Sequence, residues 1–159
     1  MKSEWVRRFI RLASRGEAMF SGTEIALRPR IYSARNRQIG CEHAFVFDIV
    51  ELAGWRVAGE IALRIGESAE QFYLGHVGYH VDPPFRGHAY AAEACRLISP
   101  LLAAFGLRSA VITTDPTNVP SIKTCLRLGC RLECTVQVPE YIREKLDISA
   151  EKRRYIWCP

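Results

Sequence analysis

Residues 81–91 read VDPPFRGHAYA, and the hydrophobic pattern of the chain changes across this stretch. On its N-terminal side, Val, Ile and aromatic residues recur as in β-strands, and on its C-terminal side apolar residues recur with the spacing of an α-helix. Two prolines end the strand, and a loop of Arg, Gly, His and small residues leads into the helix. The first amides of a helix have no partner within it and its dipole is positive there, so this loop has the composition of an anion site.

Small residues in the loop would let a phosphate approach the backbone. Gly87, Ala89 and Ala91 offer little steric hindrance, and Arg86 adds a positive charge. An ordinary strand-to-helix turn without a ligand accounts for the same spacing. The stretch lacks the GxxxxGKS/T motif of a P-loop and the three glycines of a dinucleotide fingerprint. If the loop holds a phosphate, the ligand is a different phosphate-bearing cofactor.

Strands dominate the chain before the loop. The pattern predicts a short strand at 24–27, an irregular basic stretch at 28–38, and longer strands at 44–52, 55–65 and 72–81. Short turns separate the longer strands, so this half of the chain is expected to form an antiparallel meander.

Helices and strands alternate after the loop. The pattern predicts a helix at 90–105, a buried strand at 110–114, a helix capped by Asn118 that runs to Leu128, and strands at 132–138 and 154–157. Residues 140–153 are expected to form a loop or a short helix. One strand–helix–strand crossover should pair residues 72–81 with 110–114 in parallel. Residues 1–159 are therefore predicted to be a single α/β domain with a mixed central sheet and flanking helices.

Residues 1–20 add a basic amphipathic helix at the N-terminus. Trp5, Phe9 and Leu12 recur at helical spacing, and arginines occupy the other faces. We expect this helix to pack on its own domain; a membrane-surface or targeting role and a start of translation near Met19 are the alternatives. Its apolar run is too short to span a membrane.

The composition sets the class of protein. A chain of 159 residues that is 48% hydrophobic and 25% charged is typical of globular proteins, which excludes a disordered or collagen-like chain. The six cysteines include no CxxC pair, so reduced thiols in a cytoplasmic protein are favoured over disulfides, and no metal site is expected. The net charge of +5 indicates an acidic partner, which could be a nucleic acid, a membrane or a small anionic ligand.

Two motifs in the expected order carry a family resemblance. Residues 86–91 (RGHAYA) resemble the R/Q-x-x-G-x-G/A pyrophosphate loop of the GNAT superfamily of N-acetyltransferases, particularly its RGxGYA form. Residues 118–121 (NVPS) followed by 128–130 (LGC) resemble that family's N-x-x-S…LGF element, the helix beside the pantetheine arm of the cofactor. Together the motifs cover residues 74–132, over a third of the chain.

The resemblance implies an acyl-CoA N-acyltransferase-like fold with a splayed sheet. Acetyl-CoA would lie in a V-shaped opening between the strand that ends at Val81 and the strand at 110–114. The residues that the resemblance assigns to the cofactor are Tyr79, His80, Val81, Arg86, Gly87, His88, Ala89, Tyr90, Ala91, Asn118 and Ser121. The first three would act through backbone groups, as an added strand does, and the loop would hold the pyrophosphate. Ser121 is equally well explained as a first-turn residue of its helix.

Three departures from the family pattern bear on function. Ala89 and Ala91 replace glycines in the loop, and phosphate binding is expected to survive both changes. Where many members have a tyrosine that protonates the departing CoA thiolate, this chain has Cys125, which is expected to be a small core residue; a thiol that donates is the alternative. Only about 16 residues separate the first strand from Ala44, too few for the two helices that usually form the acceptor side in relatives. Residues 1–20 or 140–153 are expected to take their place.

Transfer to an amine requires a base, and His76 is the candidate. It stands where relatives often have a glutamate, and alternation along a strand would place it on the same face as His80 and Leu74. An imidazole exchanges protons near neutral pH. A hydrogen-bonded residue of a half-buried strand is the other interpretation, and Glu60 and Tyr141 are weaker candidates. Backbone amides at the splay would polarise the carbonyl without a specific side chain.

The resulting hypothesis is an acetyl-CoA-dependent N-acetyltransferase whose acceptor is a primary amine of a small molecule, peptide or protein. A non-catalytic acyl-CoA-binding module is one alternative, because of Cys125 and the shortened acceptor side. A basic nucleic-acid-binding domain is another, since arginines gather before Ala44, but no stacking motif accompanies them. No nucleic acid and no membrane span are expected, and a homodimer stays open. The residues do not identify the acceptor or the length of the acyl group.

Overall fold

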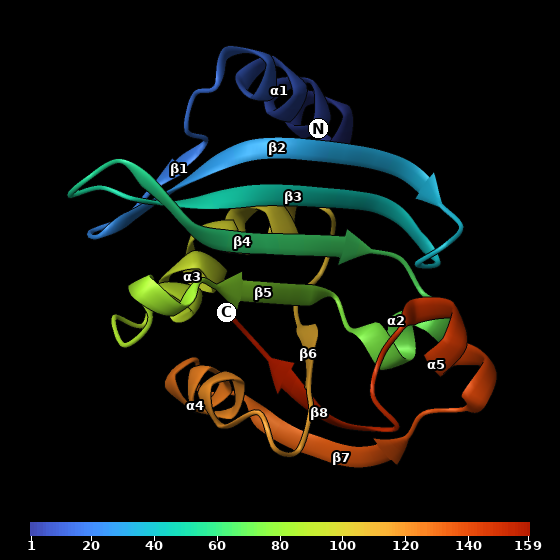
Figure 1. The fold of residues 1–159 in the computed structure, drawn as a ribbon. Helices are drawn as coiled ribbons and strands as arrows, with labels where there is room; N and C mark the ends of the chain where they lie inside the picture. Colours follow the sequence, from blue (N-terminus) through green and yellow to red (C-terminus); the bar gives the residue numbers. More distant parts are fainter.

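A single mixed sheet of eight strands organises the chain, and the computed structural model describes all residues from 1 to 159 (Figure 1). The strand order is β1-β2-β3-β4-β5-β6-β8-β7, and every neighbouring pair is antiparallel except β5 and β6. The strands are β1 (Phe20–Ser21), β2 (Ile25–Asn36), β3 (Cys41–Glu51), β4 (Arg56–Ile65), β5 (Val77–Val81), β6 (Ala110–Thr114), β7 (Arg131–Gln137) and β8 (Glu151–Trp157).

Five α-helices and one short 3-10 turn connect and flank these strands. They are α1 (Lys2–Arg15), α2 (Ala69–Leu74), the turn η1 (Pro83–Phe85), α3 (Tyr90–Ala104), α4 (Val119–Arg127) and α5 (Glu140–Leu146). The mixed α/β sheet with flanking helices and an N-terminal helix confirms the predicted fold class. The parallel pairing of β5 with β6 is confirmed as well. No helix combines the length and the apolar composition needed to cross a membrane.

Helices α1 and α3 cover one face of the sheet with an aromatic core. Phe9 of α1 is fully buried, and its ring centre lies 5.3 Å from that of Phe45 and 5.1 Å from that of Phe47 on β3. Phe105, at the end of α3, packs against Phe45 at 5.4 Å. Edge-on contacts between buried rings add to the stabilisation that burial of their apolar area provides. Tyr79 of β5 belongs to this face, because it pairs with Ile61, which pairs with Phe47.

The opposite face of β2 to β5 carries charged residues instead of helices. Arg28, Asp48, Glu60 and His80 occupy directly opposite positions on four successive strands and form one row across the sheet. Arg28 lies 3.0 Å from Asp48, and Arg30 forms ion pairs with both Asp48 and Glu60. These ion pairs satisfy the charges of the open face within the sheet itself.

Strands β5 and β6 separate soon after they meet. Their only register pair is Val77 with Ile112, preceded by a hydrogen bond from the His76 amide to the Val111 carbonyl. Beyond Val77 the two strands diverge (Figure 1), so residues 78–81 have a neighbouring strand on the β4 side alone. The sheet is thus splayed at the position that the family resemblance implies.

Two predicted segments are wrong in detail. Residues 28–36 are not irregular, because β2 continues to Asn36, paired with β3 along its length, and a register shift beside Pro29 accommodates the missing amide. Residues 72–74, predicted to begin a strand, instead form the end of helix α2. The Ser68 hydroxyl caps this helix by accepting from the Gln71 amide at 3.0 Å, and Gly75 ends it with a φ of 79°.

Other boundaries move by a few residues for local reasons. Helix α1 ends at Arg15, before the predicted limit at residue 20, because Gly16 adopts the left-handed conformation that ends helices. Residues 140–146 form the short helix, and β8 starts at Glu151, three residues earlier than predicted. Helix α4 begins as predicted, with the Asn118 side chain accepting a hydrogen bond from the Ser121 amide.

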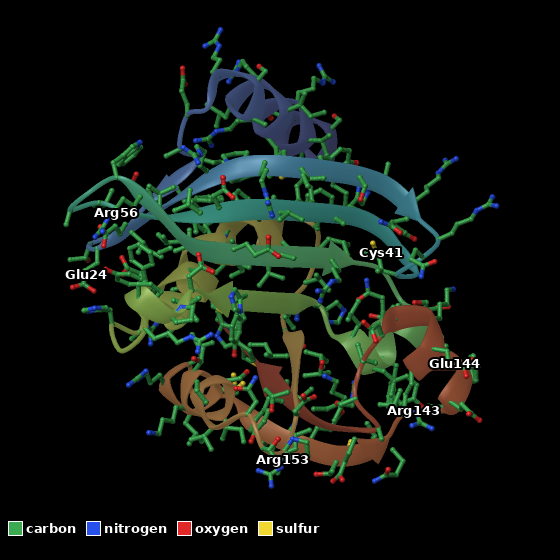
Figure 2. The ribbon with its side chains drawn as sticks, in the orientation of Figure 1. Glu24, Cys41, Arg56, Arg143, Glu144 and Arg153 are labelled. Carbon is green, nitrogen blue, oxygen red and sulfur yellow. The ribbon has the colours of Figure 1, made fainter.

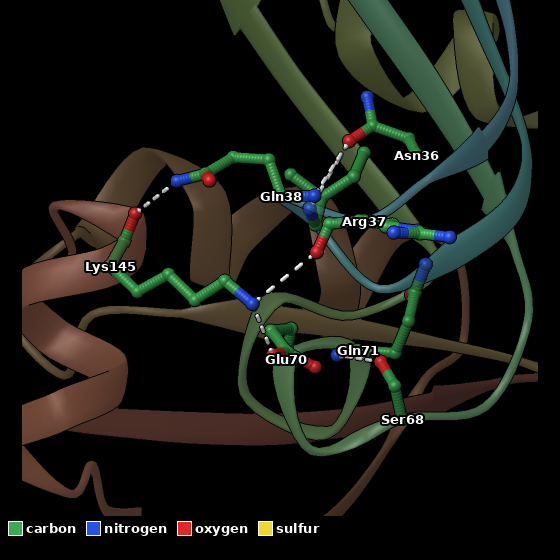
Figure 3. Close-up of polar contacts among 8 residues, drawn as sticks. Asn36, Arg37, Gln38, Ser68, Glu70, Gln71 and Lys145 are labelled. Atoms are coloured by element: carbon green, nitrogen blue, oxygen red, sulfur yellow. Dashed lines mark hydrogen bonds and ion pairs between the residues drawn. The ribbon is translucent and has the colours of Figure 1, made fainter.

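Helix α5 is tied to the turn between β2 and β3, which is far from it in sequence (Figure 3). The Lys145 ammonium group donates to a Glu70 carboxylate oxygen at 2.6 Å and to the Arg37 carbonyl at 3.3 Å. In return, the Gln38 side chain donates to the Lys145 carbonyl at 2.6 Å. These contacts join α5, α2 and the β2–β3 turn at one end of the sheet.

Candidate functional site

A cavity of about 420 Å³ opens between the end of β5, the loop at 82–89 and helix α4. Its walls comprise Tyr79, His80, Val81, Phe85, Arg86, Gly87, Ala89, Tyr90, Ala91, Asn118, Val119, Pro120, Ser121, Lys123, Thr124 and Arg127. Of the residues that the family resemblance assigns to the cofactor, all line this first cavity except His88. The exposed His88 ring stacks on Tyr90 at 5.2 Å and contributes no surface to the cavity.

The loop leaves a run of backbone amides without hydrogen-bond partners. Arg86 is the last loop residue whose amide donates within the chain, to Pro83, and the next donating amide is that of Glu93, to Ala89. The amides of residues 87–92 between them donate to no protein acceptor. Free amides at the positive end of a helix are the groups that bind phosphate.

Two loop residues adopt the left-handed conformation that turns the chain into α3. Gly87 has a φ of 89° and Ala89, the N-cap of α3, has a φ of 59°. No atom lies within 4 Å of the position that a Cβ atom would take at Gly87, so this glycine faces open space. At Ala89 the same conformation is strained, because the side chain approaches the following carbonyl group.

Basic side chains surround the first cavity, and no acidic side chain lines it. The Nε atom of Arg86 donates to the Val81 carbonyl at 2.8 Å, which orients its guanidinium group. Lys123 and Arg127 add two positive charges from α4. The sequence analysis missed both, although their four-residue spacing places them on one helix face.

The outer end of the loop packs against the sheet through an aromatic contact. Arg56 begins β4 at the same end of the sheet as the loop (Figure 2), and its guanidinium carbon lies 5.0 Å from the centre of the Phe85 ring. An arginine over an aromatic face is attracted by the negative charge of the ring surface. The contact helps to hold η1 and therefore the start of the loop.

Strand β5 and helix α4 are connected by hydroxyl groups across the opening. The Tyr79 hydroxyl lies 2.9 Å from the Ser121 hydroxyl and 3.9 Å from the Cys125 thiol. Burial raises the pKa of Tyr79 above its ordinary value, so the hydroxyl keeps its proton at neutral pH. Cys125 itself is fully buried.

A second cavity of about 280 Å³ lies on the open face of the sheet and meets the first at β5. Tyr79, His80, Asn118 and Ser121 line both cavities. The remaining walls of the second cavity are Glu60, Ala62, Arg64, Leu74, Val77, Gly78, Ile112, Thr113, Thr114, Asp115 and Lys152. A ligand that follows β5 from the loop would thus present its far end to this second cavity.

His80 is the imidazole at the junction of the two cavities. It belongs to the open face of β5, opposite Glu60, and its Nε2 atom lies 3.2 Å from an Asp82 carboxylate oxygen. Glu60 lines the second cavity and forms an ion pair with Arg30. Tyr141 is 63% exposed and lines neither cavity.

His76 lies elsewhere, in a third cavity on the far side of the β5–β6 contact. The expectation that it shares a strand face with His80 and Leu74 is wrong, because Leu74 ends α2 and His76 precedes β5. Its Nδ1 atom accepts a hydrogen bond from the Val111 amide at 3.0 Å. Burial lowers the pKa of His76, and the lone pair that a base needs is already engaged.

The segments expected to replace the acceptor-side helices contribute little to the cavities. Helix α1 packs on the helical face of the sheet and lines neither cavity. Helix α5 packs against α2 and the β2–β3 turn and also lines neither cavity. From residues 140–153 only Lys152 reaches the second cavity. No helix from residues 1–20 or 140–153 therefore closes the second cavity. The chain also contains no cluster of three or more metal-ligating side chains.

Comparison with known proteins gives one family and a set of similar folds. Residues 4–131 match the family described as "Acetyltransferase (GNAT) domain". A search of curated proteins found no match. Among solved structures, the microcin C7 self-immunity acetyltransferase MccE, in complex with acetyl-CoA and AMP, has a TM-score of 0.56 and 22% identity over 73% of this chain.

Two further structures resemble the chain at similar or lower identity. A ribosomal-protein-S5-alanine acetyltransferase from Vibrio fischeri has a TM-score of 0.56 and 22% identity over 72% of this chain. A GCN5-related N-acetyltransferase from Brucella melitensis has a TM-score of 0.61 and 15% identity, with 87% of this chain and 77% of that chain covered. The alignments span 61% of the MccE and Vibrio fischeri chains. At these identities the likeness shows the fold.

Proposed function

The chain belongs to the GNAT acetyltransferase family, and we propose that it transfers the acetyl group of acetyl-CoA to a primary amine of a small molecule, peptide or protein. In this proposal residues 1–159 act as one catalytic domain. The unpaired cysteines support a cytoplasmic setting, since such thiols persist in reducing compartments.

The free amides of residues 87–92 are the observation that carries the proposal. They lie at the start of α3 beside Arg86, in a cavity without acidic side chains. The pyrophosphate of CoA supplies the acceptors that these amides lack, and Lys123 and Arg127 offer a further anion site on the opposite wall for its 3′-phosphate. The chemistry of the donor groups thus fits CoA.

The splayed sheet supports a position for the rest of the cofactor. Beyond Val77, β5 has no strand partner on the side of β6. The two amide groups of the pantetheine arm can hydrogen-bond to that edge as an added strand would. The thioester, which supplies the activated acetyl group, then reaches the junction of the two cavities, next to Tyr79 and His80.

The side chains at this junction suit acyl transfer to an amine. His80 takes a proton from the acceptor amine, and Asp82 stabilises the imidazolium that results. The Tyr79 hydroxyl, on the other face of β5, donates a hydrogen bond to the departing sulfur, as relatives do with a tyrosine at the position of Cys125. His80 replaces His76 as the proposed base, because the His76 lone pair is occupied.

Titration calorimetry with CoA and an assay of thiol release test this proposal. We expect saturable CoA binding, and CoA release from acetyl-CoA that depends on an added amine and exceeds thioester hydrolysis. Absence of CoA binding at millimolar ligand would refute the proposal. Binding without amine-dependent release would instead favour a non-catalytic acyl-CoA-binding module, the function that the open acceptor side and the core position of Cys125 support.

A further inference from the structure

The charged side chains that line the second cavity are paired with one exception. Asp115 accepts from Lys152 at 2.6 Å and from the Ser149 hydroxyl at 2.5 Å. Glu60 forms an ion pair with Arg30, which reaches it from β2. Both carboxylates are therefore neutralised by neighbouring cations, and the cavity has no free negative charge.

Arg64 is the exception, because it takes part in none of the ion pairs of the molecule. Its side chain is partly buried on the open face of β4, and burial lowers its pKa to about 10, which leaves it charged at neutral pH. A charge removed from water is costly unless an opposite charge or strong hydrogen bonds compensate it. Arg64 thus places one uncompensated positive charge in the wall of the cavity.

The hydrogen bonds of Arg64 use only one of its three nitrogens. The Nη1 atom donates to the carbonyl groups of Leu74 and Gly75 at 3.4 and 3.3 Å, both long for such bonds. The Nη2 and Nε atoms donate to no protein acceptor. The Nε and Nη2 donors of a guanidinium group lie side by side, and when both are free they can bind a carboxylate or phosphate through two parallel hydrogen bonds.

Gly78 allows the guanidinium group to lie against strand β5. A Cβ atom at this position would come within 2.6 Å of the Nη2 atom of Arg64, so any other residue would displace it. Gly78 and His80 point to the same face and are two residues apart, which is roughly 6.6 Å along a strand. The free Nη2 donor of Arg64 therefore lies over Gly78, two residues along β5 from His80, the proposed base.

We infer that Arg64 binds an anionic group of the acceptor, and that the acceptor is an amine with a carboxylate or similar anion several bonds from the reacting nitrogen. This inference rests on the proposed function, because it requires the amine to enter through the second cavity and react at its junction with the first. The anion occupies the free donors of Arg64, and the amine then lies beside His80. Neutral amines of the same length lack the charge-assisted contact.

A matched pair of probes tests the acceptor class. For 5-aminopentanoate and its amide, 5-aminopentanamide, we expect the acid to have the higher kcat/KM with acetyl-CoA by about tenfold to a hundredfold, the range for a hydrogen bond to a charged group. Arg64→Gln should bring the ratio close to one, chiefly through KM, and Arg64→Lys should retain part of the preference. Arg28→Gln is the control, since it removes a cation of the same face that pairs with Asp48 outside the cavity.

A second pair of probes distinguishes a small-molecule acceptor from a peptide. The peptides Ala-Glu-Ala-Ala and Ala-Gln-Ala-Ala differ only in the charge of the side chain next to the amino terminus. An Arg64-dependent preference for Glu identifies an acidic peptide, and a preference confined to the aminopentanoate pair identifies a small acceptor. Equal rates within both pairs, or a preference that survives in Arg64→Gln, would overturn the inference.

CoA affinity separates this inference from the proposed function. Arg64 does not line the first cavity, so calorimetry should give the same CoA affinity for wild type and Arg64→Gln, which also shows that the variant is folded. If CoA binds and no anionic probe is acetylated faster than the thioester hydrolyses, the acceptor class is wrong while the CoA site stands. If CoA does not bind, the proposed function itself fails.

Discussion

The hydroxyl groups of Tyr79 and Ser121 lie 2.9 Å apart and join strand β5 to helix α4 across the opening of the sheet. The two residues belong to both cavities, so this contact marks the boundary between the proposed cofactor site and the proposed acceptor site. The Tyr79 hydroxyl also lies 3.9 Å from the Cys125 thiol, one helical turn beyond Ser121 on α4.

Tyr79→Phe tests the hydroxyl group without removing the ring. We expect kcat to fall by tenfold or more, because the departing sulfur loses its donor, while CoA affinity changes little. The free energy of unfolding should fall by about 1 kcal/mol, since the Ser121 hydroxyl loses a partner. Steady-state kinetics and urea unfolding measure these effects, and Ser121→Ala controls for the hydrogen bond alone. An unchanged kcat would remove Tyr79 from the mechanism.

Charge reversal around the first cavity should weaken CoA binding. Arg86→Glu and Lys123→Glu are each expected to lower the affinity tenfold or more, because each replaces an attraction for phosphate by a repulsion. The Lys123→Glu effect should shrink with dephospho-CoA if this lysine faces the 3′-phosphate. Arg131→Glu, on exposed β7, is the control for the change in net charge. Calorimetry that gives equal affinities for all variants would contradict the assignment of this wall.

Ala89→Gly should stabilise the protein, which is unusual for a glycine substitution. The φ of 59° at Ala89 strains an alanine, and glycine adopts it freely, so the free energy of unfolding should rise by up to about 1 kcal/mol. Ala91→Gly is the matched control, because Ala91 lies in the first turn of α3 and should lose about 0.5–1 kcal/mol. Urea unfolding measures both, and a destabilised Ala89→Gly would argue against the left-handed conformation of the loop.

His76 should act on stability and not on turnover. Burial lowers the pKa of His76 in the folded state below the ordinary 6.5, so the unfolded chain binds a proton at a higher pH than the folded chain does. The neutral imidazole therefore favours the folded state at neutral pH, and this contribution to the free energy of unfolding is lost as the pH falls below about 6.5. His76→Asn keeps an acceptor near the Val111 amide but does not titrate there. The slope of unfolding free energy against pH between 5 and 6.5 should therefore flatten, with kcat and its pH profile unchanged. A large loss of kcat in this variant would restore His76 as the base.

The parts of the fold that depend on local signals could be predicted from the sequence. Asn118 caps α4 because its side chain satisfies an amide three residues later, and that signal is contained in the sequence itself. The loop after Val81 could be predicted for the same reason, since its prolines, its glycine and its small residues determine its conformation locally. Most of the residues predicted for the cofactor belong to these two local segments, and they line one cavity.

Features that depend on tertiary pairing could not be predicted in the same way. Strand β2 extends through a basic stretch because Arg28 and Arg30 pair with Asp48, which is distant in sequence. Helix α2 forms where the start of a strand is predicted, because the Ser68 side chain caps its first turn. The sequence alone does not show where α2 ends and β5 begins, since apolar residues continue from one into the other. Arg64 resembles any polar residue of an alternating strand, and only the structure reveals that it lacks an ion-pair partner.

The arginines that gather before Ala44 divide into two groups in the structure. Arg28 and Arg30 form ion pairs on the open face. The others, on α1 at positions 7, 8, 11 and 15 and around the β2–β3 turn at positions 35 and 37, are exposed and form no ion pair. The positive charge of the N-terminal half is therefore partly neutralised within the sheet.

Amide chemical shifts on titration with CoA test the central claim most directly. In a ¹⁵N-labelled sample, the amides of residues 87–92 should shift saturably, because they gain the phosphate acceptors that the free protein does not provide. The amide of Glu93, already bonded to Ala89, serves as the internal reference and should move less. CoA binding that leaves the amides of 87–92 unshifted, or no binding at millimolar CoA, would contradict the account.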